Sequence, residues 1–160
     1  MEEVRQDGGA KDGIKRRSAT SVGYESELQL RVRYQETDQM GVVYHGNYFT
    51  YFEMGRTELL REATGVSYRH VEELDVMMVV SEARCQYLKP ARYDDLLTLK
   101  TRVARITGAS LSHEYELYRD DVLLAKGATT LVCVNKEGRI VPVPDWIRNF
   151  NKGAVPGNSE

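Results

Sequence analysis

Hydrophobic and polar residues alternate along much of this chain, with one long interruption. From Leu28 to Tyr34 every second residue is apolar or aromatic, which predicts a half-buried strand. Asp120-Asp121 predicts a tight hairpin turn further along. Four later runs have strand composition: 76–88, 96–106, 111–119 and 122–134. The pattern therefore predicts an antiparallel sheet of about five strands.

Between the first two predicted strands the apolar spacing changes to that of a helix, from Asn47 to about Thr64. Asn47 suits the N-cap position, and Gly65 suits the left-handed position that ends a helix. Gly55 lowers helix stability by about 1 kcal/mol relative to alanine, so we expect a neighbouring segment to approach it closely. The apolar stripe consists of Tyr48, Phe52, Leu59, Leu60 and Ala63.

Length and composition indicate one soluble globular domain. The chain has 160 residues, of which 41% are hydrophobic and 29% charged. We expect a domain at 25–150, a disordered tail at 1–24 and a polar tail at 151–160, with short helical turns at 67–74 and 146–150. The first residues are polar and acidic, unlike a secretory signal or a mitochondrial presequence. We therefore expect a cytoplasmic protein.

Several function classes lack support in the sequence. The net charge of −2 gives no basic field for nucleic acid, and no apolar run approaches the ~20 residues of a membrane span. His70 and His113 match no metal-ligand spacing, and Cys85 and Cys133 match neither metal nor redox spacing. We therefore expect no metal, no cofactor and no nucleic-acid partner. Phosphate-binding loops and serine-hydrolase elbows are also missing from the sequence.

Residues suited to acyl chemistry gather between Tyr34 and Tyr48. Glu36 and Asp38 form an acidic tip after the first strand, and on an extended backbone they share one side. His45 precedes the predicted helix, whose N-terminus offers free backbone N–H groups. A carboxylate beside such N–H groups matches what acyl transfer requires. Glu36 is expected either as a solvated acidic residue or as a neighbour that supports the site.

The pattern Tyr-x-Glu-Thr-Asp-x-x-Gly-Val-Val-Tyr-His-Gly-Asn-Tyr, which starts at Tyr34, resembles the signature of the hotdog-fold acyl-CoA thioesterases. More narrowly, it is similar to the 4-hydroxybenzoyl-CoA thioesterase branch, which includes the Tol-Pal-associated thioesterases. The resemblance covers roughly Leu28 to Pro144 and returns in the stretch from Tyr87 to Asp95. It implies an α+β hotdog fold, in which the sheet wraps around one long helix.

The resemblance also implies roles for individual residues. Asp38 falls on the catalytic carboxylate of that branch, acting as nucleophile or as general base for water. The backbone amide of His45 would polarise the thioester carbonyl, and its side chain would orient substrate or water. Tyr44 belongs to the same catalytic segment, and Gly46 would let the thioester approach the backbone. Asn47 would shape the oxyanion site through the helix dipole.

Further substrate contacts are expected around this segment. Glu53 is expected to be exposed or to pair with Arg56, or else to point into an acyl pocket. Arg84, Lys89 and Arg92 are expected to contact the phosphates of coenzyme A, as basic residues of this region and of a neighbouring subunit do in the family. A homodimer or homotetramer is expected, because a sheet covered by one helix leaves an edge strand exposed.

The resulting hypothesis is an acyl-CoA thioesterase that needs no cofactor, with acyl-carrier-protein thioesters as a close variant of the substrate. Two rivals remain open at this point. One is a hotdog dehydratase or hydratase acting on acyl thioesters, which usually places a histidine and an acid differently. The other is a non-catalytic module that binds acyl-CoA, against which the intact Asp38 argues.

Overall fold

The computed structural model describes residues 24–149. The expected tails lie outside the described residues, apart from Tyr24, whose carbonyl accepts a hydrogen bond from the amide of Val103. Within the described part no helix is long and apolar enough to cross a membrane. The elements are β1 (Glu25–Arg31), the 3-10 turn η1 (Tyr34–Glu36), α1 (Asn47–Thr64), α2 (Tyr68–Glu73), β2 (Met77–Tyr87), β3 (Leu96–Ile106), β4 (Ser110–Arg119), β5 (Val122–Val134) and α3 (Asp145–Arg148).

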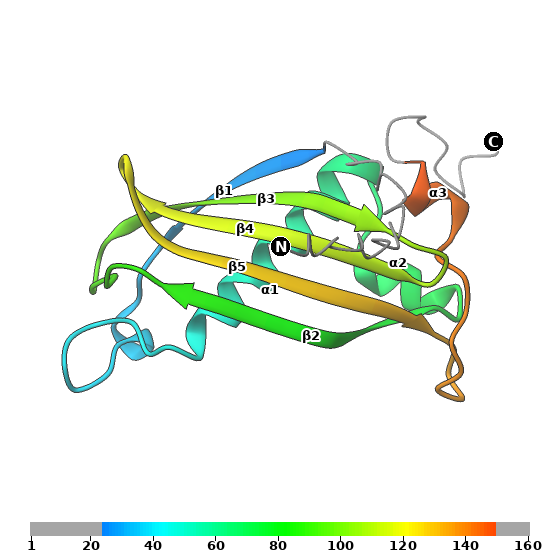
Figure 1. Ribbon diagram of the computed structural model, residues 1–160, viewed down its shortest axis with the longest axis horizontal. Coiled ribbons are helices and arrows are strands. Elements are labelled where there is room, and N and C mark those ends of the chain that lie inside the picture. Colours follow the sequence, from blue (N-terminus) through cyan, green and yellow to red (C-terminus); the bar gives the residue numbers. More distant parts are fainter. Residues whose placement is uncertain (1–23, 150–160) are drawn as a thin grey trace, which may run out of the picture.

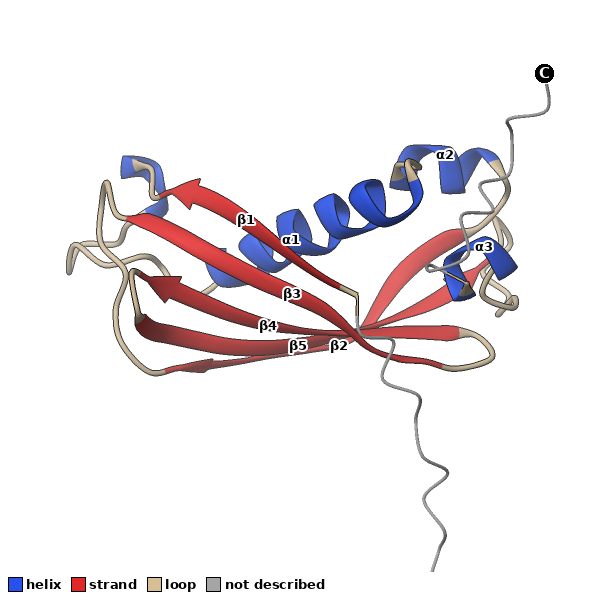
Figure 2. Cartoon of the chain, turned by 90° about the horizontal axis from the view of Figure 1, so that it is seen from above, coloured by secondary structure: helices blue, strands red, loops and turns tan. Residues whose placement is uncertain are grey.

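The five strands form one sheet in the order β1-β3-β4-β5-β2, and every pairing is antiparallel. Helix α1 crosses one face of the sheet, and the strands curve around it (Figures 1 and 2). The α+β hotdog arrangement expected from the resemblance is therefore confirmed. In this order β1 and β2 are the two edge strands, and β2 pairs with β5 alone among the described residues.

Alternation along β3 and β4 creates the buried face of the sheet. Residues 97, 99, 101 and 103 of β3 turn inward, as do residues 111, 113, 115 and 117 of β4. Phe52 of α1 stacks on Tyr115, with ring centroids 4.4 Å apart. The same ring lies over Gly127 of β5, where an added Cβ would stand 2.2 Å from it. Glycine at position 127 thus lets the helix pack directly against the sheet.

Helix α1 has the bounds that the sequence predicts, and its two glycines have the expected roles. A Cβ on Gly55 would stand 2.6 Å from the Leu99 side chain and 2.4 Å from that of Thr101, so the close approach is confirmed. Gly65 ends the helix with φ 70°, which glycine adopts without a steric penalty. The expected turn at 67–74 contains α2, and its Ser67 side chain accepts a hydrogen bond from the amide of His70.

Two local predictions are wrong. The first strand ends at Arg31, and residues 34–36 form a 3-10 turn instead of extending the strand. Periodicity alone cannot detect this turn, because Val32 remains buried as it would in a strand. The second error concerns the cap residue of α1: the helix begins at Asn47 as predicted, but Gly46 occupies the cap position expected for Asn47.

Candidate active site

Asp38 lies in a tight loop that its own backbone and side chain hold together. Its amide donates to the carbonyl of Val42 (2.9 Å), and its carbonyl accepts from the amide of Gly41 (3.0 Å). Oδ1 of Asp38 accepts from the amide of Met40 at 2.8 Å. Gly41 has φ 78°, a conformation that favours glycine. The loop therefore places a partly exposed carboxylate in a defined position.

The end of this loop is attached to the segment that joins β2 to β3. The amide of Val43 donates to the carbonyl of Ala91 at 2.8 Å, and Val42 forms an isolated antiparallel bridge with Arg92. Val43 and Ala91 are both buried. These contacts explain why two segments about fifty residues apart contribute to one site: the segment around Pro90 lies directly beside the Asp38 loop.

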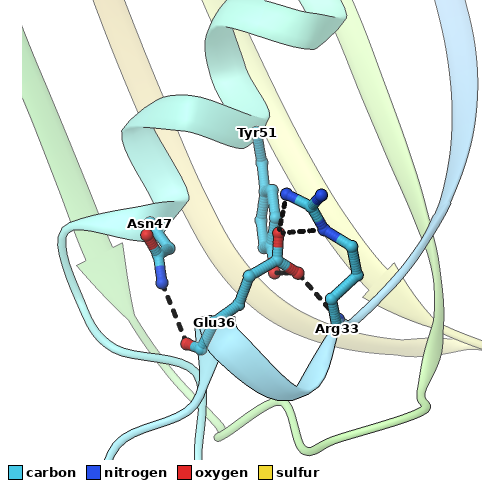
Figure 3. Close-up of polar contacts among 4 residues, drawn as sticks. All are labelled: Arg33, Glu36, Asn47 and Tyr51. Carbon is cyan, nitrogen blue, oxygen red and sulfur yellow. Dashed lines mark hydrogen bonds and ion pairs between the residues drawn. The ribbon is translucent and has the colours of Figure 1, made fainter.

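Glu36 connects the loop to α1 (Figure 3). Its carboxylate accepts hydrogen bonds from the backbone amide and guanidinium of Arg33 and from the hydroxyl of Tyr51. Its carbonyl accepts from the amide of Tyr44 and from the side-chain amide of Asn47. The side chain is buried, so Glu36 is not the solvated acidic residue considered above. It supports the site by fixing the segments on both sides of it.

The expectation that Glu36 and Asp38 share one side of an extended strand is wrong. The bonds from Arg33 close the 3-10 turn and direct the Glu36 carboxylate inward, whereas Asp38 belongs to the next loop. The prediction that Asn47 caps the helix also needs correction. Asn47 is the first helical residue, and its Nδ2 donates to Glu36 at 2.9 Å instead of accepting from the helix.

Two backbone N–H groups stand free just before α1. The amides of His45 and Gly46 donate no hydrogen bond to any residue between 24 and 149, whereas the next three amides bond back to residues 44, 45 and 46. Such unpaired amides at a helix start bind negative charge. The space beside Gly46 is taken by the ring of Tyr44, which an added Cβ would meet at 2.8 Å. Tyr44 also lies against the His45 ring, with centroids 4.3 Å apart.

Asp38 and His45 line one pocket of about 300 Å³ at this end of the helix. Lys89 and Tyr87 contribute from the other wall, and the Tyr87 hydroxyl donates to the carbonyl of His45 at 2.8 Å. The ring of Tyr87 meets that of Tyr48 edge to face at 4.9 Å. The remaining lining residues are Val42, Val43, Leu88 and Pro90. Asp38, His45 and Lys89 thus line one small hollow beside the start of α1.

The other expected substrate contacts lie elsewhere. Arg92 lies beside Val42 without lining the pocket, and its amide donates to Asp95. Arg84 lines a groove with Lys100 and Lys126, whose alternation places them on the sheet face away from α1. Glu53 is exposed along the flank of α1 and makes no ion pair with Arg56 in the described part of the chain. Arg84 is therefore not brought together with Lys89.

Sequence reasoning missed two residues that shape the pocket, Tyr51 and Tyr87. Tyr51 lies on the helical face with Tyr48 and Phe52, where an aromatic residue is usually core. Tyr87 belongs to the second matching stretch of the family pattern, which was the available signal for it. Burial, and then the bond to Glu36, raises the pKa of Tyr51 well above its usual value, so this hydroxyl stays a hydrogen-bond donor.

Comparisons with known proteins show which family the chain matches. A family model described as the thioesterase-like superfamily matches residues 32–150. The acyl-CoA thioesterase YbgC of Haemophilus influenzae is 37% identical over 114 residues, which cover 71% of this chain and 83% of that protein. A putative esterase of Aquifex aeolicus is 36% identical over 114 residues, covering 71% and 88%.

Solved structures give the same result. A hypothetical protein from Thermus thermophilus matches with a TM-score of 0.74 and 36% identity, covering 82% of this chain and 98% of that one. The DHNA-CoA thioesterase of Staphylococcus aureus matches with a TM-score of 0.72 and 31% identity, covering 80% and 89%. Because the family model spans most of the chain, and both sequence and fold agree with it, this protein belongs to the thioesterase-like superfamily of hotdog-fold domains.

Proposed function

We propose that this protein hydrolyses acyl-CoA thioesters to a free acid and coenzyme A. The single observation that supports this best is the pocket that Asp38 and His45 line together beside the start of α1. There the amides of His45 and Gly46 have no hydrogen-bond partner among residues 24–149. Relatives named as acyl-CoA thioesterases support the choice of substrate.

In the proposed reaction the amides of His45 and Gly46 bind the carbonyl oxygen as it gains negative charge. Asp38 either attacks the carbonyl carbon or removes a proton from an attacking water. The carbon–sulfur bond then breaks, and the coenzyme A thiolate leaves and takes up a proton. In the nucleophilic route water cleaves the resulting mixed anhydride, which restores the carboxylate. The imidazole of His45 orients substrate or water, and Tyr44 holds that ring in place.

Coenzyme A would enter past Lys89, which lines the pocket, and past Arg92, which lies beside Val42. We propose that the side chains of these two residues form charge-assisted hydrogen bonds with the phosphates of coenzyme A. Arg84 lies on the other face of the sheet, so we assign it no contact with coenzyme A bound at this pocket. Asn47 acts through Glu36, which it helps to hold beside the helix start.

We also propose a homodimer that forms through β2. Residues 79–84 of this edge strand are all exposed in the single chain, including Val79 (43%) and Val80 (49%). An exposed edge strand of this length, with two adjacent valines, is a ready template for pairing with another strand. Pairing with the same strand of a second copy would cover it and give closed two-fold symmetry.

A panel of acyl-CoA thioesters, assayed by release of free thiol, tests the reaction. We expect turnover of at least one member, with no requirement for added metal or nucleotide. Binding without thiol release would instead indicate a non-catalytic module, and formation or loss of a double bond without thiol release would indicate a dehydratase. Acid quenching followed by peptide mass analysis separates the two routes, since only nucleophilic attack adds the acyl mass to Asp38.

A further inference from the structure

A cluster of polar side chains lies beneath the middle of α1, away from the Asp38 pocket. His113 of β4 stands directly opposite Thr129 of β5 and is only 1% exposed. Its Nδ1 has no hydrogen-bond partner among residues 24–149. Burial, and then the charge of Arg56, lowers the pKa of His113 to about 3, so the ring is neutral at physiological pH. A neutral imidazole nitrogen in this position can donate or accept a hydrogen bond.

Tyr68 of α2 adds a second buried polar atom of this kind. Its hydroxyl is also without a partner in the described part of the chain, although both Arg56 and Glu53 lie close enough to influence its pKa. Burial raises that pKa above its usual value, so the hydroxyl keeps its proton. Buried polar atoms are nearly always satisfied in folded proteins. Two unsatisfied atoms around one arginine therefore point to a missing partner.

Arg56 is the charged member of the cluster. It is half-buried on α1, and no carboxylate lies within ion-pair distance of it among the described residues. Its charge acts on Tyr68, His113 and Tyr115, and it lies within reach of the Tyr115 hydroxyl. That hydroxyl already bonds to Thr129 at 2.6 Å. A half-buried guanidinium whose buried neighbours Tyr68 and His113 are neutral is well suited to bind an oxygen acceptor.

Two members of this cluster, Arg56 and Thr129, line a groove of about 250 Å³ between α1 and β2. His113 lies behind that lining, directly opposite Thr129 in the sheet. Phe49, Glu53 and Arg56 line the groove from the helix at the spacing of one helical flank. Val80 and Ala83 form the opposite wall, and Thr129 lies on β5 below. The groove is therefore apolar at the Phe49 end and along β2. Near Arg56 it offers hydrogen-bond donors, the guanidinium of Arg56 and the hydroxyl of Thr129.

The groove follows the same helix that begins at the Asp38 pocket. Tyr48 lines that pocket, and the adjacent Phe49 lines the groove. From Gly46 to Arg56 the helix rises about 15 Å, at about 1.5 Å per residue. The long Arg56 side chain spans part of that length. A medium-length acyl group could thus run from the helix start along α1 and bring its far end to the cluster.

We propose that Arg56, together with Thr129, His113 and Tyr68, forms a polar subsite that selects acyl groups carrying a hydrogen-bond-accepting oxygen, a carbonyl or a carboxylate, at their far end. This inference rests on the proposed thioesterase function, because it assigns the acyl part of that substrate to the groove. Glu53 lies nearer the helix start and repels an anion that stops short of Arg56. A second copy paired at β2 adds a wall to the groove, since strand pairing extends the sheet in its own plane.

Binding of non-hydrolysable thioether analogues of coenzyme A tests the subsite separately from catalysis. Three analogues share an eight-carbon chain and end in a methyl group, a ketone at the penultimate carbon or a carboxylate. We expect the ketone or the carboxylate analogue to bind at least about tenfold tighter than the methyl analogue, as one charge-assisted hydrogen bond provides. Equal affinities for all three overturn the subsite. If the oxygen-containing analogues bound more tightly but the matching thioesters were not hydrolysed, the subsite would be supported and the proposed thioesterase function would be contradicted.

Variants distinguish recognition from a structural role. Arg56→Met keeps length and apolar packing, and we expect it to abolish the oxygen preference while the methyl analogue binds as before. Arg61→Met is the matched control, because Arg61 lies on the same helix and pairs with Glu58 away from the groove. Glu53→Gln should strengthen binding of the carboxylate analogue alone. An equal loss for all three analogues in Arg56→Met, with a normal melting temperature, would contradict the proposal. If Arg56→Met fails to fold, Thr129→Val supplies the same test, with Thr130→Val as its control.

Discussion

The hydroxyl of Tyr51 donates a hydrogen bond to Oε1 of Glu36 across 3.0 Å, and this bond ties the second turn of α1 to the segment that carries Asp38. Glu36 lies outside the pocket and touches none of the groups that would react. It nevertheless determines where the loop and the helix start stand relative to each other, because its carbonyl also accepts from Tyr44 and Asn47.

Removing this carboxylate should lower both stability and activity. Glu36→Gln keeps the shape but loses the charge that holds Arg33, so we expect a loss of about 1–3 kcal/mol in the free energy of unfolding. Urea denaturation measures this change. Glu27→Gln is the control, because Glu27 pairs with Lys100 on the surface, and we expect it to stay within about 0.5 kcal/mol of wild type. A Glu36→Gln protein as stable as the control would show that the contacts of Figure 3 contribute little.

The Asp38 carboxylate should be essential for turnover and dispensable for folding. Asp38→Asn keeps the shape of the side chain but removes the base or nucleophile, so we expect kcat to fall by at least about 100-fold with little change in substrate affinity. Steady-state kinetics with the best acyl-CoA measures both quantities. Asp121→Asn, in the turn between β4 and β5, controls for loss of an acidic charge. If the folded Asp38→Asn variant kept more than about a tenth of the wild-type kcat, Asp38 would be removed from the mechanism.

Lys89 and Arg92 should matter only when the nucleotide part of coenzyme A is present. Replacing either by alanine should raise KM for acyl-CoA several-fold and leave kcat nearly unchanged, because contacts that are equal in ground and transition states act on KM. The same variants should match wild type with an acyl-pantetheine thioester. Arg84→Ala provides the comparison on the opposite face of the sheet. A KM effect confined to Arg84→Ala would reverse the assignment.

The oligomeric state should depend on β2. Light scattering should give twice the chain mass of 18.2 kDa at micromolar concentration. Val79→Lys places a charge on the exposed edge without entering the groove that Val80 lines, and it should shift the protein towards monomer, with loss of activity if the partner completes the site. Ile140→Lys tests the same chemical change at an exposed turn position. A monomeric and fully active wild-type protein would exclude the proposed dimer.

His113 should make stability depend on pH. Its pKa falls from 6.5 to about 3 in the folded protein, so between these values the unfolded chain binds the additional proton. Stability is therefore lost as pH falls below 6.5, by up to about 1.4 kcal/mol per pH unit. Thermal melts of His113→Gln between about pH 7 and pH 5 should show a shallower decline than wild type. The substitution His70→Gln is the control, because it changes a histidine outside the core. If melting temperature fell equally steeply with pH in His113→Gln and in wild type, this role of His113 would be contradicted.

Most helices and strands of this protein could be predicted from the sequence, and so could the segment proposed to carry its chemistry. Period-two alternation located β3 and β4, and the stripe from Tyr48 to Ala63 defined α1. These features are local, because each follows from which side chains one strand or helix must bury. The family pattern from Tyr34 to Tyr48 directed attention to Asp38 and His45, which the structure places in one pocket.

Which of the expected residues lie in the same pocket depends on the tertiary fold. Lys89 joins Asp38 because the amide of Val43 bonds to the carbonyl of Ala91, and no sequence spacing encodes that contact. Glu36 turned inward because Arg33 and Tyr51 satisfy its carboxylate, and Tyr51 lies fifteen residues away. Arg84 lies on the sheet face away from α1. Alternation along a strand separates two sets of side chains, but the sequence does not say which set faces the helix. Such contacts between distant segments depend on burial and hydrogen bonding summed over the whole chain. They therefore cannot be derived from the local sequence pattern of either segment.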